Sequence, residues 1–150
     1  MLIRQSISGY KHIDLGNIKL AFTQVCREEL FKDVYFAANS LYYVEAGTAE
    51  ISTGNETVRI KKGEVCLIRQ HSKVNIQKIR DKNGNDFRSI IFYLFPDFVT
   101  DFIKERKLHN AFSTETADMP LIHLKKQGSL QEFCESLLPL FENPTLIVWT

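Results

Sequence analysis

Residues 39–95 read NSLYYVEAGTAEISTGNETVRIKKGEVCLIRQHSKVNIQKIRDKNGNDFRSIIFYLF, and their apolar residues form short runs separated by turn signals, not helical stripes. Two dipeptides, Gly54-Asn55 and Asn83-Gly84, tolerate the positive φ angles that tight hairpins require. Gly47 adds a position where the backbone can bend or bulge without a Cβ clash. The pattern predicts antiparallel strands that fold back on one another in a barrel or sandwich.

The expected strands of this stretch are residues 41–45, 49–53, 58–61, 65–69, 74–80 and 87–95. Before it, residues 17–25 alternate as a strand covered on one face would. Residues 2–8 are expected to form an edge strand, with a break at Ser8-Gly9. Residues 26–32 fit either one helical turn or a charged loop, and the short apolar segment 34–37 leads into the hairpins.

The pattern becomes helical after residue 95. Pro96 can begin a helix, and residues 96–108 place their large apolar side chains on one face. Residues 109–118 predict a loop and residues 121–124 a last strand. Ser129 and Glu132 form a capping box for a second amphipathic helix, which Pro139 should kink or end. The apolar tail LIVWT is either a covering strand or the end of a chain cut short of its natural partner segment.

Composition limits the classes of protein to consider. A chain of 150 residues fits one domain, and a net charge of +1 gives no general attraction to nucleic acid. The three cysteines form no C-x-x-C pair, so neither a zinc site nor a disulfide framework is indicated. The N-terminus lacks the apolar core of a signal peptide, and the longest apolar run is too short to span a bilayer. A cytoplasmic location is therefore expected.

Motifs that carry catalysis are absent from the sequence. It contains no P-loop, GxGxxG or HExxH motif, and its four histidines are scattered over unrelated segments. His71 is expected in a solvated loop at the barrel mouth. A solvated, solubilising face is expected for the basic residues of the hairpins, which are Arg59, Lys61, Lys62, Lys78, Arg80 and Lys82. The sequence therefore predicts that the protein is not an enzyme.

The order of turns resembles a known superfamily. Residues 42–67, YYVEAGTAEISTGNETVRIKKGEVCL, are similar to the sheet of the cupins. A barrel followed by PDFVTDFIKE and a second amphipathic helix resembles the N-terminal sensing and dimerisation domain of AraC-type transcription regulators, over about residues 15–142. The resemblance implies a mainly β fold: a cupin-like double-stranded β-helix barrel over about residues 15–95, followed by two α-helices within 96–142, all in one regulatory domain, 1–150.

AraC-type regulators read DNA through two helix-turn-helix units placed after the sensing domain, and no such pair can be placed in residues 96–150. The resemblance therefore implies a chain that senses a ligand and dimerises, with DNA bound only through a domain outside this sequence. Two alternatives remain open: a stand-alone cupin-like sugar isomerase or epimerase, and a pure protein-interaction domain.

The resemblance also indicates how the barrel departs from metal-binding cupins. When Gly47 is matched to the first motif glycine, Ser40 takes the place of the glutamate ligand, and residues 33–36 occupy the candidate histidine positions. When Gly63 is matched to the second, Val74 takes the place of the last histidine. Hydroxyl and mostly apolar groups supply too few donors for a transition metal. No metal or other cofactor is therefore expected.

The same matching gives candidate binding residues. The barrel interior could enclose a small apolar or sugar-like effector, or these side chains could simply fill the core. The candidate ligand-binding residues are Val34, Phe36, Ser40, Tyr42, Val44, Val74, Ile76 and Phe92. A homodimer is expected through an apolar stripe on the second helix, for which the candidates are Leu130, Phe133, Leu137 and Phe141.

Overall fold

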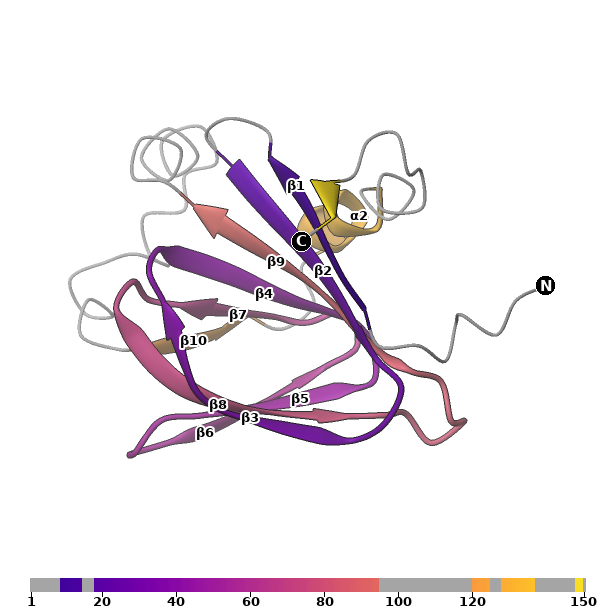
Figure 1. Ribbon diagram of the computed structural model, residues 1–150, viewed down its shortest axis with the longest axis horizontal. Helices are drawn as coiled ribbons and strands as arrows, with labels where there is room; N and C mark the ends of the chain where they lie inside the picture. The colour runs from indigo at the N-terminus through magenta and orange to yellow at the C-terminus, as the bar shows by residue number, and fades with distance from the viewer. Residues whose placement is uncertain (1–8, 15–17, 95–119, 125–127, 137–147, 150) are drawn as a thin grey trace.

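The computed structural model describes residues 9–14, 18–94, 120–124, 128–136 and 148–149 (Figure 1). Three predictions lie outside the described residues: the edge strand at 2–8, the first helix at 96–108 and the loop at 109–118. In chain order the strands are β1 (Gly9–Asp14), β2 (Ile18–Val25), β3 (Glu29–Phe36), β4 (Asn39–Ala46), β5 (Thr48–Ser52), β6 (Thr57–Lys61), β7 (Val65–Ile68), β8 (Ser72–Ile79), β9 (Phe87–Leu94), β10 (Leu121–Leu124) and β11 (Val148–Trp149), with helix α2 (Gly128–Ser136) between the last two.

The strands form two antiparallel sheets that face each other (Figure 1). One has the order β10-β7-β4-β9-β2-β1-β11, and the other β3-β8-β5-β6. Strands that follow one another along the chain often belong to different sheets, so the chain winds back and forth across the space between them. The prediction of a mainly β fold with paired antiparallel strands is confirmed.

The tight turn between β8 and β9 forms for local reasons. The Asp81 carboxylate accepts hydrogen bonds from the backbone amides of Asn83 and Asn85, each at 2.9 Å. Gly84 takes a φ of +80°, which suits glycine because it has no Cβ. These contacts reverse the chain at the Asn83-Gly84 signal and bring β9 back beside β2 and β4.

The Gly54-Asn55 turn uses a different device from the one expected. Neither residue has a positive φ. Instead, the Thr53 amide donates to the Glu56 carbonyl at 2.9 Å, and the Thr53 hydroxyl accepts from the Asn55 and Glu56 amides. The hairpin was predicted correctly, but a threonine side chain closes it.

Two predictions for the N-terminal half are corrected. Residues 26–32 are neither a helical turn nor wholly a loop, because β3 begins at Glu29 and runs without a break to Phe36. Its register against β8 shifts between Phe31 and Val34, where Asp33 takes a φ of 56°. A strand, β1, also follows the expected break at Ser8-Gly9. Pairing with β8 and with β2 supplies the hydrogen bonds of these two strands.

Both faces of the larger sheet are covered. Between the sheets lies an inner cluster that includes Phe36, Tyr42, Ile51, Ile76 and Phe87. On the outer face, a second cluster of Leu20, Phe22, Tyr43, Val65, Ile90, Phe92 and Leu94 includes Cys134 of α2. The helix therefore packs on the outside of the barrel. The tail also contributes, because β11 pairs with β1 as a covering strand.

Candidate functional site

The inner face of the barrel brings together seven of the eight candidate ligand-binding residues. Phe36, Tyr42, Val44, Val74 and Ile76 are buried in the inner cluster. Val34 packs against that cluster, and Ser40 is fully buried on the strand face that Tyr42 also uses. The residues therefore lie together in the core between the two sheets, and their role in binding stays a prediction.

Phe92 was assigned to the interior wrongly. It is buried in the outer cluster beside Leu20 and Leu94, on the side of the larger sheet that α2 covers. Successive side chains of a strand point to opposite faces, so Ile91 and Tyr93 point inward and Phe92 outward. The apolar run of β9 is buried on both sides and gives no periodic signal from which to choose the face.

The interior also contains four polar side chains. Lys78 of β8, Thr23 of β2, Ser89 of β9 and Tyr42 of β4 are all buried, with relative exposures of 7%, 7%, 0% and 0%. Lys78 Nζ donates to Thr23 Oγ1 at 3.4 Å, which links the two sheets. Thr23 Oγ1 and Ser89 Oγ share a hydrogen bond of 2.6 Å. We call these four residues the interior polar chain.

The position of Lys78 corrects the prediction of a solvated side chain. Strand β8 alternates between buried and half-buried positions, and Lys78 follows Val74 and Ile76 on the buried face. Alternation alone could have found it, because residues two apart point the same way. The charge of Lys78 suggests an exposed side chain, whereas the two-residue period of β8 correctly places it on the buried face.

The surroundings of Lys78 are aromatic. Its Nζ lies 4.5 Å from the centre of the Phe31 ring and 5.6 Å from that of Phe87, within cation–π range. No carboxylate pairs with Nζ among the residues that the structure describes, and Glu29, across from Lys78 on β3, is exposed. Burial lowers the pKa of Lys78 to about 8, against a smaller opposing effect of Glu29. The lysine is therefore a buried cation without a counter-anion in the described structure.

Tyr42 lies at the other end of the interior polar chain. Its hydroxyl is buried and makes no hydrogen bond of good geometry, although Ser89 lies close enough to lower its pKa slightly. Burial dominates and raises the pKa of Tyr42, so the group is a neutral donor at pH 7. An unsatisfied buried hydroxyl costs about 1–3 kcal/mol, which marks the position as one where a partner would stabilise the protein.

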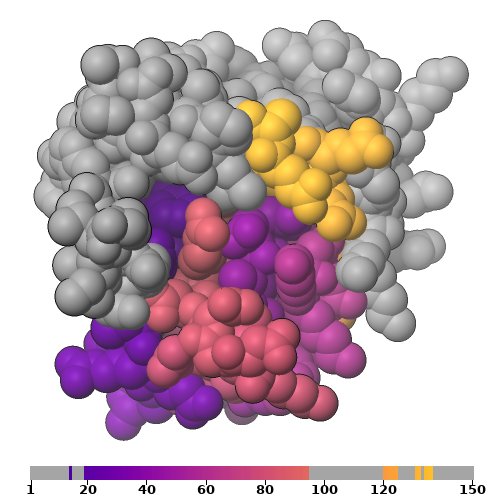
Figure 2. Space-filling view, turned by 90° about the vertical axis from the view of Figure 1, so that its right-hand side faces the viewer, coloured from indigo at the N-terminus to yellow at the C-terminus, as the bar shows by residue number. Residues whose placement is uncertain are grey.

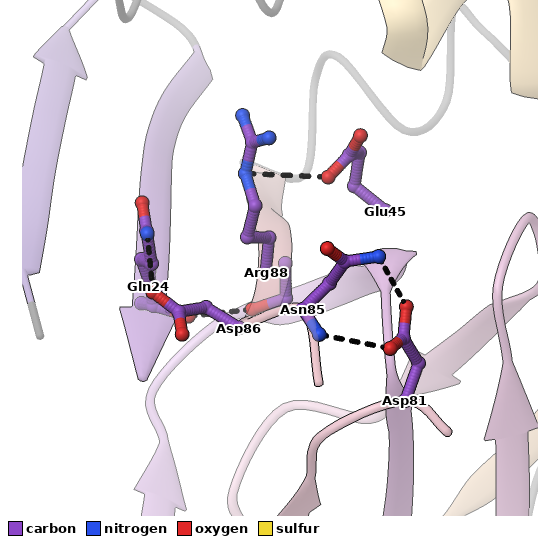
Figure 3. Close-up of polar contacts among 8 residues, drawn as sticks. Gln24, Glu45, Asp81, Asn85, Asp86 and Arg88 are labelled. Atoms are coloured by element: carbon purple, nitrogen blue, oxygen red, sulfur yellow. Dashed lines mark hydrogen bonds and ion pairs between the residues drawn. The ribbon is translucent and has the colours of Figure 1, made fainter. Parts of the chain in front are cut away.

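A polar hollow of about 410 Å³ opens at the end of the barrel where the β8–β9 turn lies. Figure 2 faces this end, with the turn in salmon toward the viewer. In Figure 3, Arg88 Nε pairs with the Glu45 carboxylate at 3.3 Å, and Gln24 donates to Asp86 at 2.8 Å. Three acids and three bases line the hollow, so their formal charges cancel; they are Glu45, Asp81, Asp86, Lys62, Arg80 and Arg88. None of the candidate ligand-binding residues lines this hollow.

The candidate dimer residues are only partly placed. Leu130 and Phe133 belong to α2, whereas Leu137 and Phe141 lie outside the described residues. Cys134 packs on the outer cluster, while Glu132 and Glu135 are exposed. At least one face of α2 is thus used by the barrel itself.

The positions matched to cupin metal ligands bring no ligand set together. Ser40 and Val74 occupy two of them inside the barrel, and the described residues contain no group of three or more His, Cys, Asp or Glu side chains placed to hold a metal ion. His71 is exposed, stacks on Tyr35 and shares a hydrogen bond with the Tyr35 hydroxyl. His123 and Glu64 pair elsewhere, at 2.9 Å, between β10 and the β6–β7 turn.

No helix among the described residues is long and apolar enough to cross a membrane.

Comparison with known proteins gives both a family and a fold. The sequence model of the ExsA N-terminal regulatory domain matches residues 39–148. A search of curated proteins finds no match. A solved structure of ToxT from Vibrio cholerae is similar with a TM-score of 0.61 at 10% identity, over 82% of this chain and 48% of that one.

Two further structures support the same fold. ToxT from Vibrio cholerae O395 bound to (E)-4-(8-methylnaphthalen-1-yl)but-3-enoic acid is similar with a TM-score of 0.61 at 10% identity, over 86% of this chain and 50% of that one. An RmlC-like cupin with a double-stranded β-helix fold from Methanocaldococcus jannaschii gives a TM-score of 0.52 at 11% identity, over 63% and 85%. The barrel is thus cupin-like, and the chain spans about half the length of the ToxT chains that it matches.

Proposed function

Because this chain belongs to the ExsA N-terminal regulatory domain family, a cupin-like domain of AraC-type transcription regulators, we propose that it senses a small effector inside its barrel and forms a dimer. The observation that carries the proposal is the match to a regulatory domain over residues 39–148, most of the barrel included. On this proposal the domain is metal-free, is not an enzyme, acts in the cytoplasm and reaches DNA only through a separate part of the regulator.

The barrel interior supports the sensing role. It is enclosed by two sheets and lined by apolar and aromatic side chains with a few convergent polar groups, which is the usual composition of a small-molecule site. A ToxT structure of similar fold holds an organic acid with a naphthalene ring. A small apolar or sugar-like effector is the ligand class that this chain would take.

Methyl NMR of the whole chain tests sensing. The chain is titrated with a panel of small apolar molecules and sugars, and the methyl signals of Val44, Val74 and Ile76 are followed. A binding effector should shift these interior methyls with a saturable curve, while the exposed Leu30 of β3 should stay unmoved. If no compound shifts the interior methyls, or if shifts appear only at surface positions, the sensing proposal is wrong.

Light scattering tests dimerisation separately. The wild-type chain should show the mass of a dimer at high concentration, and Phe133→Glu should shift it toward the monomer because a charge in an apolar interface is costly to bury. Glu132→Lys is the control, since Glu132 is exposed on the same helix. Circular dichroism checks that each variant folds. A wild-type chain that stays monomeric at every concentration would overturn the dimer.

A further inference from the structure

We infer that the interior polar chain, Lys78, Thr23, Ser89 and Tyr42, is a binding site for the carboxylate of a small, otherwise apolar organic acid. The inference rests on the proposed sensing function and names the chemical class of the effector. Its basis is the set of buried contacts inside the barrel: Lys78, Thr23 and Ser89 are linked by hydrogen bonds, and the nearby Tyr42 hydroxyl has no partner of good geometry.

The interior polar chain has more hydrogen-bond donors than hydrogen bonds. The four side chains carry six O–H and N–H donors, three of them on the Lys78 ammonium. The structure shows two hydrogen bonds among them, Lys78 to Thr23 and Thr23 with Ser89. The Tyr42 hydroxyl has no partner of good geometry. What this group of side chains lacks is an acceptor.

The positive charge of Lys78 also lacks an ion-pair partner among the described residues. Lys78 is 7% exposed, and its ammonium is compensated by the faces of Phe31 and Phe87, by one hydroxyl and by the weaker attraction of the exposed Glu29. A buried charge is stable only when it is paired and hydrogen-bonded. A water molecule could satisfy Tyr42 but would leave the positive charge uncompensated. An anionic acceptor satisfies both groups.

Among anions, a carboxylate fits the charge and the apolar surroundings of the interior polar chain best. The interior polar chain offers a single positive charge, and its neighbours in the inner cluster are apolar or aromatic. A phosphate monoester carries close to two negative charges at pH 7, so the second charge would be buried without a partner. A carboxylate has one charge and two oxygens, one able to accept from Lys78 and the other from Tyr42. The apolar lining suits the remainder of such a molecule.

The interior polar chain lies near the polar hollow, although Gln24 and Arg88 of the hollow point to the opposite face of their strands from Thr23 and Ser89. Thr23 directly precedes Gln24, and Ser89 directly follows Arg88, both of which line the hollow at the end of the barrel. Lys78 lies two residues before Arg80, another residue of that lining. The interior polar chain is therefore close to the end of the barrel at which the hollow opens.

Calorimetry with matched acids and alcohols tests the site. The probes are phenylbutyrate and octanoate, each paired with the alcohol of the same carbon skeleton, phenylbutanol and octanol. The wild-type chain should bind the acids about ten-fold or more tightly than the alcohols, because only the carboxylate can pair with Lys78. Lys78→Met should remove this preference, and Tyr42→Phe should weaken acid binding by about three-fold.

The matched controls lie on the same strands. Lys73→Met removes an exposed lysine of β8, and Tyr43→Phe removes a buried tyrosine of β4 that faces the outer cluster. Both should bind the acids as the wild type does. Thermal denaturation followed by circular dichroism shows whether each variant is folded, and a folded Tyr42→Phe decides the matter if Lys78→Met does not fold.

The outcomes separate this inference from the proposed function. Equal binding of acids and alcohols, or equal acid binding by wild type and Lys78→Met, overturns the carboxylate site while sensing stands. The same holds if the acids fail to bind but another compound shifts the interior methyls. If no compound of any class binds, both proposals fail.

Discussion

At the scale of the residue, Lys78 is the feature that most distinguishes this barrel from a simply filled one. Its ammonium is buried among Phe31, Phe87 and Thr23 on the inner face of β8. A purely structural interior would be more stable with an apolar side chain there, since burying a charge without a full partner is costly. On the inference above, the carboxylate of a bound acid would compensate this charge.

The pH dependence of stability tests the burial of Lys78 directly. Its pKa is about 8 in the folded chain against 10.5 in the unfolded chain, so the unfolded state binds more protons between these values. The free energy of unfolding should therefore rise with pH across this window, by at most about 3 kcal/mol from this group. Lys78→Met lacks this contribution and should be the more stable protein at pH 7.

The measurement is urea unfolding of both proteins from pH 7 to pH 10.5, in the absence of ligand. Other groups titrate in both proteins, so the difference between them isolates Lys78. The advantage of Lys78→Met should shrink as the pH rises. Parallel curves would mean that Lys78 is solvated in the folded protein.

At the scale of the element, the turns fix how the strands meet. Gly47 joins β4 to β5 with a φ of +85°, and a Cβ there would collide with the Ile79 carbonyl oxygen and press on Phe87. This turn thus sets the distance between the larger sheet and β8 of the smaller one. Its glycine is required for both its conformation and its small size.

Three glycine-to-alanine variants separate these two requirements. Gly47→Ala combines left-handed strain with overpacking and should cost about 2–5 kcal/mol. Gly84→Ala has a similar φ of +80°, but its Cβ would meet only the Arg80 side chain at an ordinary contact distance of 3.7 Å, so it should cost about 1–2 kcal/mol. Gly54→Ala has neither problem and should change stability by less than about 0.5 kcal/mol. Urea unfolding at pH 7 measures all three, and equal costs for Gly47→Ala and Gly84→Ala would show that the backbone at Gly47 relaxes.

At the scale of the whole molecule, two facing sheets create an interior whose polar groups come from four strands of both sheets. The strands are β2, β4 and β9 of the larger sheet and β8 of the smaller one. The interior polar chain supplies one ammonium and three hydroxyls, Ser40 adds a further hydroxyl, and the described residues contain no set of metal ligands. The same barrel architecture that holds metals in many cupins is here equipped to hold an organic anion.

Metal removal is therefore expected to leave the protein unchanged. After dialysis against EDTA, the melting temperature should equal that of the untreated protein, because on the proposed function no metal contributes to the folding free energy. Elemental analysis of the purified chain should find no stoichiometric zinc, iron, nickel or manganese. A melting temperature that falls on chelation and recovers with one added metal would contradict a metal-free barrel.

The sequence by itself determined the strands of residues 39–94, because side-chain alternation and turn chemistry are local properties of the chain. It also gave the family resemblance and most of the inward-facing residues. It did not determine the pairing of these strands: of the consecutive strands from β4 to β9, only β5 and β6 pair with each other, and the others alternate between the two sheets. Tertiary structure decided which face of β9 is inside, where β3 begins, and that Lys78 is buried. These features depend on contacts with the second sheet and with α2, which are distant in sequence from the strands concerned. A local sequence pattern does not specify what will cover each face of a strand.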